Sequence, residues 1–260
     1  MRKEKLKIGI YELTGCAGDA LLIVDCEEDL INIFQAADIE AFLMAKSDNR
    51  DGELDVALVE GSVSTEKEKE ELLDIRKRAK AVVAIGNCAC VGGIQAAFLD
   101  KKEWEKNFKK VYGNHKFSHA KPIQSKPIDA YVKVDHYLPG CPIGKEQFLA
   151  TFARVLAGNP PDLYRFPVCV ECKWNENDCL LNKDILCLGP LTLAGCGSIC
   201  INHNLPCVGC WGPTEEANWT SEYHLLLEKG YDIEAIKKRM ANYSGTRIAE
   251  FFEQFRKEKK

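Results

Sequence analysis

The stretch "LKIGIYELTGCAGDA", residues 6–20, places a short apolar segment, a glycine-containing loop and a cysteine in direct succession. Residues 6–13 have the length and apolar character of a β-strand, and residues 20–37, "ALLIVDCEEDLINIFQAA", have apolar side chains at helical spacing. A strand followed by a helix of this length is typical of a parallel sheet.

The same alternation continues through the first half of the chain. Further strands are predicted at residues 39–45, 54–61, 81–87 and 130–138, and further helices at residues 65–80 and 145–158. This order predicts an α/β fold with a doubly wound parallel sheet of the flavodoxin-like type. Residues 101–128 interrupt the pattern with a long, lysine-rich segment broken by proline. We expect a surface excursion there, either a solvated face or a basic patch for an acidic partner.

The character of the sequence changes after "GNPPDLYRFP", residues 158–167. Residues 167–213 show little periodicity and are rich in Cys, Gly and Pro, so they need something else to hold them together. Helical patterns return beyond residue 214, at 215–230, 232–243 and 246–260. We expect two domains: a flavodoxin-like domain at 1–158, and an irregular cysteine-rich domain with a C-terminal helical tail at 159–260.

Composition excludes several classes of function. The formal net charge of −4 provides no basic surface for nucleic acid, and the longest apolar runs are far too short to span a membrane. The first residues, "MRKEKLKIGIYEL", contain neither an apolar signal region nor a twin-arginine motif, so we expect the protein to stay in the cytoplasm. Disulfides are disfavoured there, and 13 cysteines in a reducing compartment indicate metal binding.

Eight of the cysteines lie close together in the cysteine-rich segment and fall into two quartets. The first has the spacing C-x2-C-x6-C-x7-C and consists of Cys169, Cys172, Cys179 and Cys187. The second has the spacing C-x3-C-x6-C-x2-C and consists of Cys196, Cys200, Cys207 and Cys210. Four thiolates suit either tetrahedral zinc or a cubane iron–sulfur cluster, and the spacing alone does not choose between them.

Three further cysteines each follow a predicted strand and have glycine nearby: Cys16, Cys88 and Cys141. In a doubly wound sheet the carboxyl ends of the strands form one edge, and ligands bind there at the switch point of the topology. Glycine lets the backbone approach closely, and neighbouring N–H groups can donate to an anionic sulfur. We therefore expect these three cysteines to form one further site.

This site needs a fourth ligand, and three residues compete for the role. Asp19 lies three residues after Cys16, at the spacing that a C-x2-C loop uses, and has the best geometry. Cys90 lies only two residues after Cys88, so binding one metal with both would strain their side chains. Cys26 lies too far along the following helix. The alternative role for Asp19 is to cap a helix that starts near residue 20, which is compatible with ligation.

Six segments together resemble the small subunit of a cytoplasmic, group 3 type [NiFe] hydrogenase. They are "LTGCAGD" (13–19), "LVEGSVS" (58–64), "IGNCACVGG" (85–93), "LPGCPIG" (138–144), "CLGPLTLAGCGSIC" (187–200) and "PCVGCWGP" (206–213). The resemblance runs from about residue 6 to residue 213. The C-terminal quartets are similar to those of sulfhydrogenase delta subunits and of methyl-viologen-reducing hydrogenase small subunits. Asp19 in place of the usual second cysteine resembles the deazaflavin-reducing hydrogenase.

The resemblance implies three [4Fe–4S] clusters in a row. The proximal cluster would be held by Cys16, Asp19, Cys88 and Cys141. The distal cluster would be held by Cys169, Cys172, Cys179 and Cys187, and the medial cluster by Cys196, Cys200, Cys207 and Cys210. Cys26 and Cys90 are expected to be buried thiols without a ligand role.

The resemblance also implies partners. The nickel–iron site would belong to a separate large subunit, and a further iron–sulfur or flavin subunit of the diaphorase type would exchange electrons with this chain. Glu60 would lie at the large-subunit face, in a hydrogen-bonding or proton-transfer role. The alternative is a polar loop residue at this position, with Ser62 or Ser64 capping the next helix.

Two other functions compete with this interpretation. A zinc-stapled interaction protein would explain the two C-terminal quartets but not the three cysteines at the sheet edge. An iron–sulfur subunit of the complex I type would share the fold and one cluster, but it lacks the C-terminal cysteine block and carries adjacent cysteines at the edge. A nucleotide-binding dehydrogenase is excluded because the first loop contains no G-x-G-x-x-G.

Overall fold

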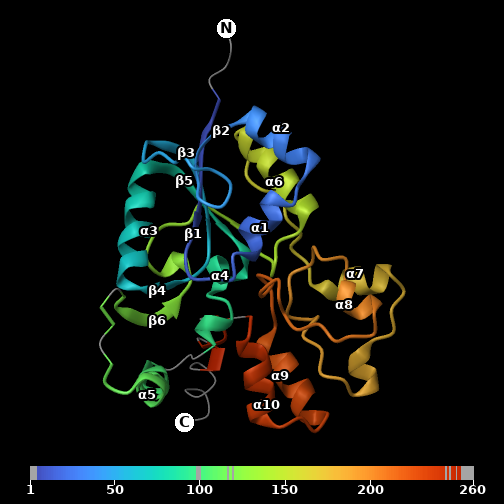
Figure 1. Cartoon of the computed structure of the whole chain (residues 1–260). Coiled ribbons are helices and arrows are strands. Elements are labelled where there is room, and N and C mark those ends of the chain that lie inside the picture. The colour runs from blue at the N-terminus through green and yellow to red at the C-terminus, as the bar shows by residue number, and fades with distance from the viewer. Residues whose placement is uncertain are drawn as a thin grey trace. The chain divides into compact units, whose positions relative to one another are not determined.

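The computed structural model describes residues 5–97, 101–115, 117–118, 120–243, 245, 247–249 and 251–252 (Figure 1). The chain divides into two compact units, Met1–Cys90 with His115–Asp162, and Val91–Asn114 with Leu163–Lys260. The segment Val91–Asn114 thus belongs to the second unit by its contacts, which no pattern in the sequence indicates. The domain boundary at residue 158 stays a prediction.

The first unit is built on a five-stranded parallel sheet with the order β2-β1-β3-β5-β7. Its strands are β1 (Lys7–Glu12), β2 (Asp38–Phe42), β3 (Leu54–Glu60), β5 (Ala79–Ile85) and β7 (His136–Leu138). The chain winds to one side of β1 and then to the other, which is the flavodoxin-like order. The predicted α/β fold with a parallel sheet is confirmed.

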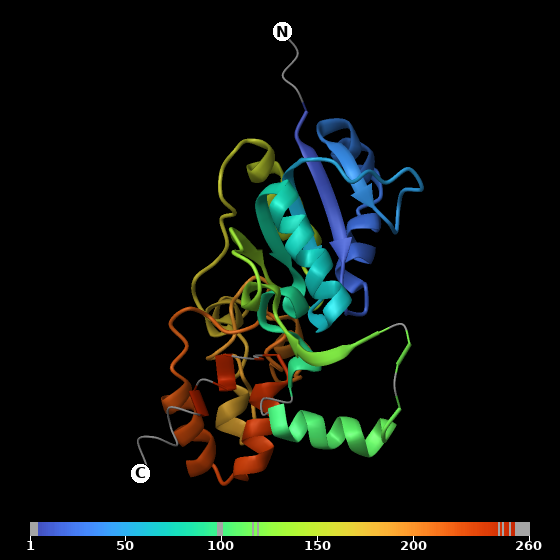
Figure 2. The same ribbon diagram turned by 90° about the vertical axis from the view of Figure 1, so that its left-hand side faces the viewer.

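Helices cover both faces of this sheet. They are α1 (Gly18–Val24), α2 (Glu28–Ala36), α3 (Glu66–Arg78) and α6 (Lys145–Leu156), while α4 (Gly86–Val91) follows β5 at the carboxyl end of the sheet. Figure 1 shows α1, α2 and α6 on one side of the strands and α3 on the other, and in Figure 2 the cyan α3 crosses in front of the sheet. Because both faces are covered, β3 and β5 are buried along most of their length.

Two elements differ from the sequence-based expectation. The helix expected at 20–37 is two helices, and Glu27, with φ of 50°, breaks it between α1 and α2. The strand expected at 130–138 is shortened to β7, since Ile128–Ala130 forms a 3-10 turn. The Asp135 carboxylate accepts the Val82 N–H at 2.9 Å and so replaces a backbone hydrogen bond of the ladder.

The lysine-rich segment is more regular than expected. It contains α5 (Lys101–Tyr112) and β6 (Pro122–Lys126), and β6 pairs antiparallel with β4 (Val63–Thr65). None of the side chains of α5 is buried, so that helix is a surface element of the second unit.

The second unit contains short helices around the cysteine-rich segment. They are α7 (Val168–Trp174), α8 (Ile199–Asn202), α9 (Trp219–Glu228) and α10 (Ile233–Ala241), with 3-10 turns at Ile94–Ala96 and Leu180–Lys183. The predicted helices at 215–230 and 232–243 correspond to α9 and α10. Most of the helix expected at 246–260 lies outside the described residues. No helix among the described residues is both long enough and apolar enough to cross a lipid bilayer.

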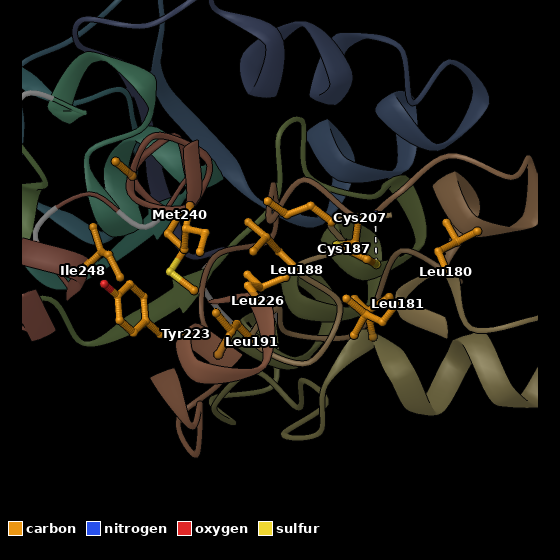
Figure 3. Close-up of a cluster of buried hydrophobic side chains, with 14 of the residues drawn as sticks. Leu180, Leu181, Cys187, Leu188, Leu191, Cys207, Tyr223, Leu226, Met240 and Ile248 are labelled. Carbon is orange, nitrogen blue, oxygen red and sulfur yellow. Dashed lines mark hydrogen bonds between the residues drawn. The ribbon is translucent and has the colours of Figure 1, made fainter. Parts of the chain in front are cut away.

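The core of the second unit explains how the cysteine-rich segment is held. Leu188 and Leu191, from the loop between the two quartets, pack with Leu226 of α9 and Met240 of α10 (Figure 3). All four side chains are buried, with Leu226 and Met240 fully so. The C-terminal helices therefore supply the apolar surface that the cysteine-rich segment lacks.

Candidate metal centres

The first candidate centre lies at the carboxyl end of the parallel sheet. Cys16 follows β1, Cys88 lies in α4 directly after β5, and Cys141 follows β7. Burial raises the pKa of the Cys141 thiol, and the negative charges of Asp19 and Cys16 raise it further. The hydrogen bond from the Ile143 N–H to the Asp19 carboxylate shows that the segments after β1 and β7 meet at one edge, as the strand pattern predicts.

Asp19 is held in this edge by contacts on two sides. Its Oδ1 accepts a hydrogen bond from the backbone N–H of Ile143 at 2.8 Å. A Cβ atom at Gly86, whose φ is +78°, would overlap the Asp19 carboxylate. Burial raises the pKa of Asp19 to about 6, against the lowering effect of the Ile143 N–H. The carboxylate therefore lies between the Cys141 loop and the start of α4.

The structure corrects the alternative role for Asp19. Helix α1 begins at Gly18, and its N-cap residue is Ala17, which has left-handed backbone geometry and no side-chain capping bond. Asp19 is thus inside the first turn, where its carboxylate points to Ile143 and does not cap the helix. Its role as an iron ligand stays a prediction.

The two competing cysteines lie in the interior. Cys26 is fully buried, and its Sγ donates to the Leu22 carbonyl at 3.4 Å. Cys90 is also buried, and its Sγ donates to the Ala84 carbonyl at 3.5 Å. Burial raises the pKa of both thiols, as it does that of the proposed ligand Cys141, so the carbonyl contacts and the buried positions are what distinguish these two cysteines.

Glu60 ends β3 at the same edge and is only 2% exposed. Its Oε2 accepts the backbone N–H of Ala20 at 2.5 Å, so it satisfies a donor at the start of α1 that has no partner within the helix. Burial raises the pKa of Glu60 to about 7, and the nearby carboxylates of Asp19 and Glu12 add to the effect. Glu60 thus anchors the helix that carries Asp19.

The capping expected of Ser62 or Ser64 is performed by another residue. Thr65 is the N-cap of α3 and forms a capping box with Glu68. Glu68 also accepts the hydroxyl of Thr14 at 2.6 Å, which ties the Cys16 loop to α3. The T-x-x-E signature at 65–68 is the sequence signal that could have identified Glu68.

The first C-terminal quartet has Gly189 close to two of its sulfur atoms. Burial raises the pKa of Cys169 to about 12, and the Cys187, Cys172 and Cys179 thiols add to it. A Cβ at Gly189 would lie 3.2 Å from the Cys169 Sγ and 3.6 Å from the Cys187 Sγ.

Backbone N–H groups also point at the sulfur atoms. The Cys207 N–H donates to the Cys187 Sγ at 3.3 Å, and the N–H of Gly189 donates to the same thiol. N–H groups of Ser198 and Ile199 donate to Cys196. Such donors stabilise a thiolate and the negative charge of a cluster bound to it.

The second C-terminal quartet contains two pairs of neighbouring cysteines, Cys196 with Cys200 and Cys207 with Cys210. Burial raises the pKa of Cys196, with Cys200 among its charged neighbours. Burial raises the pKa of Cys207 to about 12, and Cys210 lies close enough to contribute. The Thr192 hydroxyl lies 3.4 Å from the Cys207 Sγ.

Two buried carboxyl groups near the quartets were missed by sequence reasoning. Glu171 lies between Cys169 and Cys172 in α7, and Glu222 lies in α9; each is less than a tenth exposed. The Oε1 of Glu222 has no hydrogen-bond partner among the described residues, and its charge acts on Cys169. Neither stands in a pattern that distinguishes it from a surface glutamate, because both belong to amphipathic or irregular segments.

The donor sets fit iron–sulfur clusters. Soft thiolates, inward N–H donors and a glycine that leaves room beside the sulfurs are the features that such clusters require. Among the described residues, no three His, Cys, Asp or Glu side chains are arranged to hold a single metal ion. The assignment of each ligand to a cluster stays a prediction.

Comparison with known proteins extends these observations. Residues 16–155 match the family described as NADH ubiquinone oxidoreductase, 20 Kd subunit. Sulfhydrogenase 2 subunit delta of Pyrococcus furiosus is 38% identical over 90% of this chain and 97% of its own length. A subunit of the F420-non-reducing hydrogenase of Methanothermobacter thermautotrophicus is 27% identical over 94% of this chain and 93% of its own length. The iron-sulfur subunit of the F420-non-reducing hydrogenase of Archaeoglobus profundus is 28% identical over 80% of this chain and 82% of its own length.

Solved structures show the same fold. An NAD+-reducing [NiFe]-hydrogenase chain in the H2-reduced state has a TM-score of 0.52 and 27% identity, and the match covers 61% of this chain and 95% of that one. A [NiFeSe]-hydrogenase chain from Dm. baculatum has a TM-score of 0.58 and 17% identity, with coverage of 94% and 100%. At that identity the second match supports the fold alone.

Together the sheet-edge site and the family match define the class of protein as a redox subunit with the fold of the NADH ubiquinone oxidoreductase 20 Kd subunit. Within this class, the chain belongs to the family of small, electron-transfer subunits of [NiFe] hydrogenases, oxidoreductases whose catalytic site lies in the large subunit. The hydrogenase relatives extend beyond residue 155 into the cysteine-rich block, so the resemblance stated from the motifs is confirmed.

Proposed function

We propose that this chain relays electrons between the nickel–iron site of a separate large subunit and a further redox subunit, in an assembly that oxidises or evolves hydrogen. The observation that carries this proposal is that the segments of Cys16 and Cys141 are joined at one sheet edge by the hydrogen bond from the Ile143 N–H to the Asp19 carboxylate. A protein that only bound zinc in its two C-terminal quartets would not need cysteines at the edge of the sheet. The name of the Archaeoglobus relative, an iron-sulfur subunit, supports clusters as the cofactors.

Three [4Fe–4S] clusters are proposed, held by the proximal, distal and medial sets of four ligands given above. When bound, they supply one-electron carriers of low potential. The residues of this chain hold them with thiolates and one carboxylate, and they donate backbone N–H groups to the sulfurs of Cys187 and Cys196. The buried surroundings of Cys172, Cys187 and Cys207 keep water away from the ligands.

The partners follow from the relatives. A large subunit would carry the nickel–iron site, and a diaphorase-type iron–sulfur or flavin subunit would take up the electrons. The similarity to a chain of an NAD+-reducing [NiFe]-hydrogenase supports this second partner. We place Glu60 near the large-subunit interface, where its buried carboxyl group holds α1 and has a pKa close to neutrality. We propose a cytoplasmic location for the assembly.

Anaerobic purification of the assembly tests the function. We expect a brown protein with about a dozen iron atoms and a dozen labile sulfides per chain, and a nickel-containing subunit that copurifies with it. Colourless protein that contains zinc would favour the zinc-stapled alternative. Cluster-containing protein without a nickel-containing partner would contradict the hydrogenase role.

A further inference from the structure

A buried glutamate connects the two quartets of the second unit. Glu171 lies in α7 between Cys169 and Cys172 and is 6% exposed. Its Oε1 accepts the backbone N–H of Gly195 at 2.9 Å, and its Oε2 lies 4.0 Å from the Cys196 Sγ. A residue flanked by two proposed distal ligands therefore contacts the first proposed medial ligand.

The other end of α7 is bonded to the same loop. The amide of Asn175 donates to the Gly197 carbonyl at 2.8 Å and to the Ser198 hydroxyl at 2.9 Å. Gly197 and Ser198 both have left-handed backbone geometry, with φ of 63° and 53°. These bonds satisfy the polar groups of a strained turn, so α7 and the Cys196–Cys200 loop are joined at two points.

Among the described residues, no basic side chain is hydrogen-bonded to the Glu171 carboxylate. Its two oxygens face a backbone N–H and a thiol, neither of which carries a positive charge. In a buried setting of low effective dielectric, a negative charge acts strongly on neighbouring groups. A carboxylate beside a ligand sulfur disfavours the addition of an electron to a cluster held there.

We propose that Glu171 is a positioning residue that holds the Cys196 loop against α7 and lowers the reduction potential of the medial cluster relative to the distal one. This inference rests on the proposed function, because it presumes that both quartets hold iron–sulfur clusters. It deepens that function by assigning a role to a residue that binds no iron.

The test compares Glu171→Gln with Glu176→Gln in the complete, anaerobically purified assembly. Glu176 is exposed and lies five residues further along the chain, so its replacement removes the same charge without the contact to Cys196. The readouts are iron and sulfide content, the potential of each cluster in a redox titration followed by electron paramagnetic resonance, and the magnetic interaction between the two reduced clusters.

We expect Glu171→Gln to raise the potential of the medial cluster relative to the distal one, or to lose about four of the dozen iron atoms, while Glu176→Gln matches the wild type. Wild-type potentials and an unchanged magnetic interaction in Glu171→Gln would overturn the inference. If Glu171→Gln does not fold, Glu171→Asp decides: it keeps the charge but shortens the reach to Gly195, so an unchanged magnetic interaction would overturn the positioning role. A wild-type protein without clusters would instead contradict the proposed function.

Discussion

The carboxylate of Asp19 accepts the backbone N–H of Ile143 at 2.8 Å, across 124 residues of the chain. This bond joins the first turn of α1, just after the loop of Cys16, to the loop after β7, which carries Cys141. This bond fixes the position of the side chain that stands in place of the usual second cysteine.

Replacement of Asp19 should affect one cluster only. We expect Asp19→Ala to lower the iron content by about four atoms of a dozen, because the proximal set loses its fourth ligand and the Ile143 N–H loses its acceptor. Asp19→Cys should retain the iron and change the paramagnetic resonance spectrum of the proximal cluster. The exposed Asp25, replaced by Ala, is the matched control. Full iron content in Asp19→Ala with an unaltered spectrum would show that Asp19 is not a ligand.

A methyl group at Gly189 should disturb the distal cluster. The added Cβ would lie 3.2 Å from the Cys169 Sγ, a tight contact that requires this sulfur to shift by a few tenths of an ångström, and 3.6 Å from the Cys187 Sγ, which is an ordinary contact. We expect Gly189→Ala to lose about four iron atoms. Gly52→Ala is the control, since a Cβ there meets no atom within 4 Å. Equal iron content in the two variants would argue against a distal cluster at this position.

The thirteen cysteines should separate into ligands and buried thiols. We expect Cys179→Ala to lose about four iron atoms, because the distal quartet becomes incomplete. Cys26→Ala should keep the full iron content, because the Cys26 thiol already bonds to the Leu22 carbonyl inside the first unit. Iron and sulfide analysis of both variants checks this. If Cys26→Ala folds but loses iron, the assignment of Cys26 as a buried thiol without a ligand role is contradicted.

Arg76 should contribute to the stability of the first unit. Its guanidinium lies 2.6 Å from the Asp135 carboxylate and also donates to the carbonyls of Ala79 and Lys80. We expect Arg76→Ala to lower the free energy of unfolding by about 1–2 kcal/mol, because it leaves a half-buried carboxylate and two carbonyls without this donor. The exposed Lys77, replaced by Ala, is the control. Denaturant midpoints of the two variants give the comparison, and equal midpoints would contradict the prediction.

Local pattern was sufficient for the sheet and for the choice of candidate ligands. Strand and helix periods in residues 6–158 arise from which side chains face the core, so the parallel sheet and its functional edge could be predicted. The spacing of the eight C-terminal cysteines likewise depends only on the sequence. Where local geometry competes with periodicity, as at Glu27 with its positive φ, the expected long helix was wrong.

The sequence by itself determined a parallel α/β sheet, three groups of candidate ligands and the resemblance to a hydrogenase small subunit. Only the tertiary structure decided that Asp19 bonds to Ile143 and that Glu171 contacts Cys196. It also decided that the leucines between the quartets pack on α9 and α10. The physical reason is that periodicity records which side of an element is buried, whereas the partner of a buried polar group depends on which distant segment packs against it.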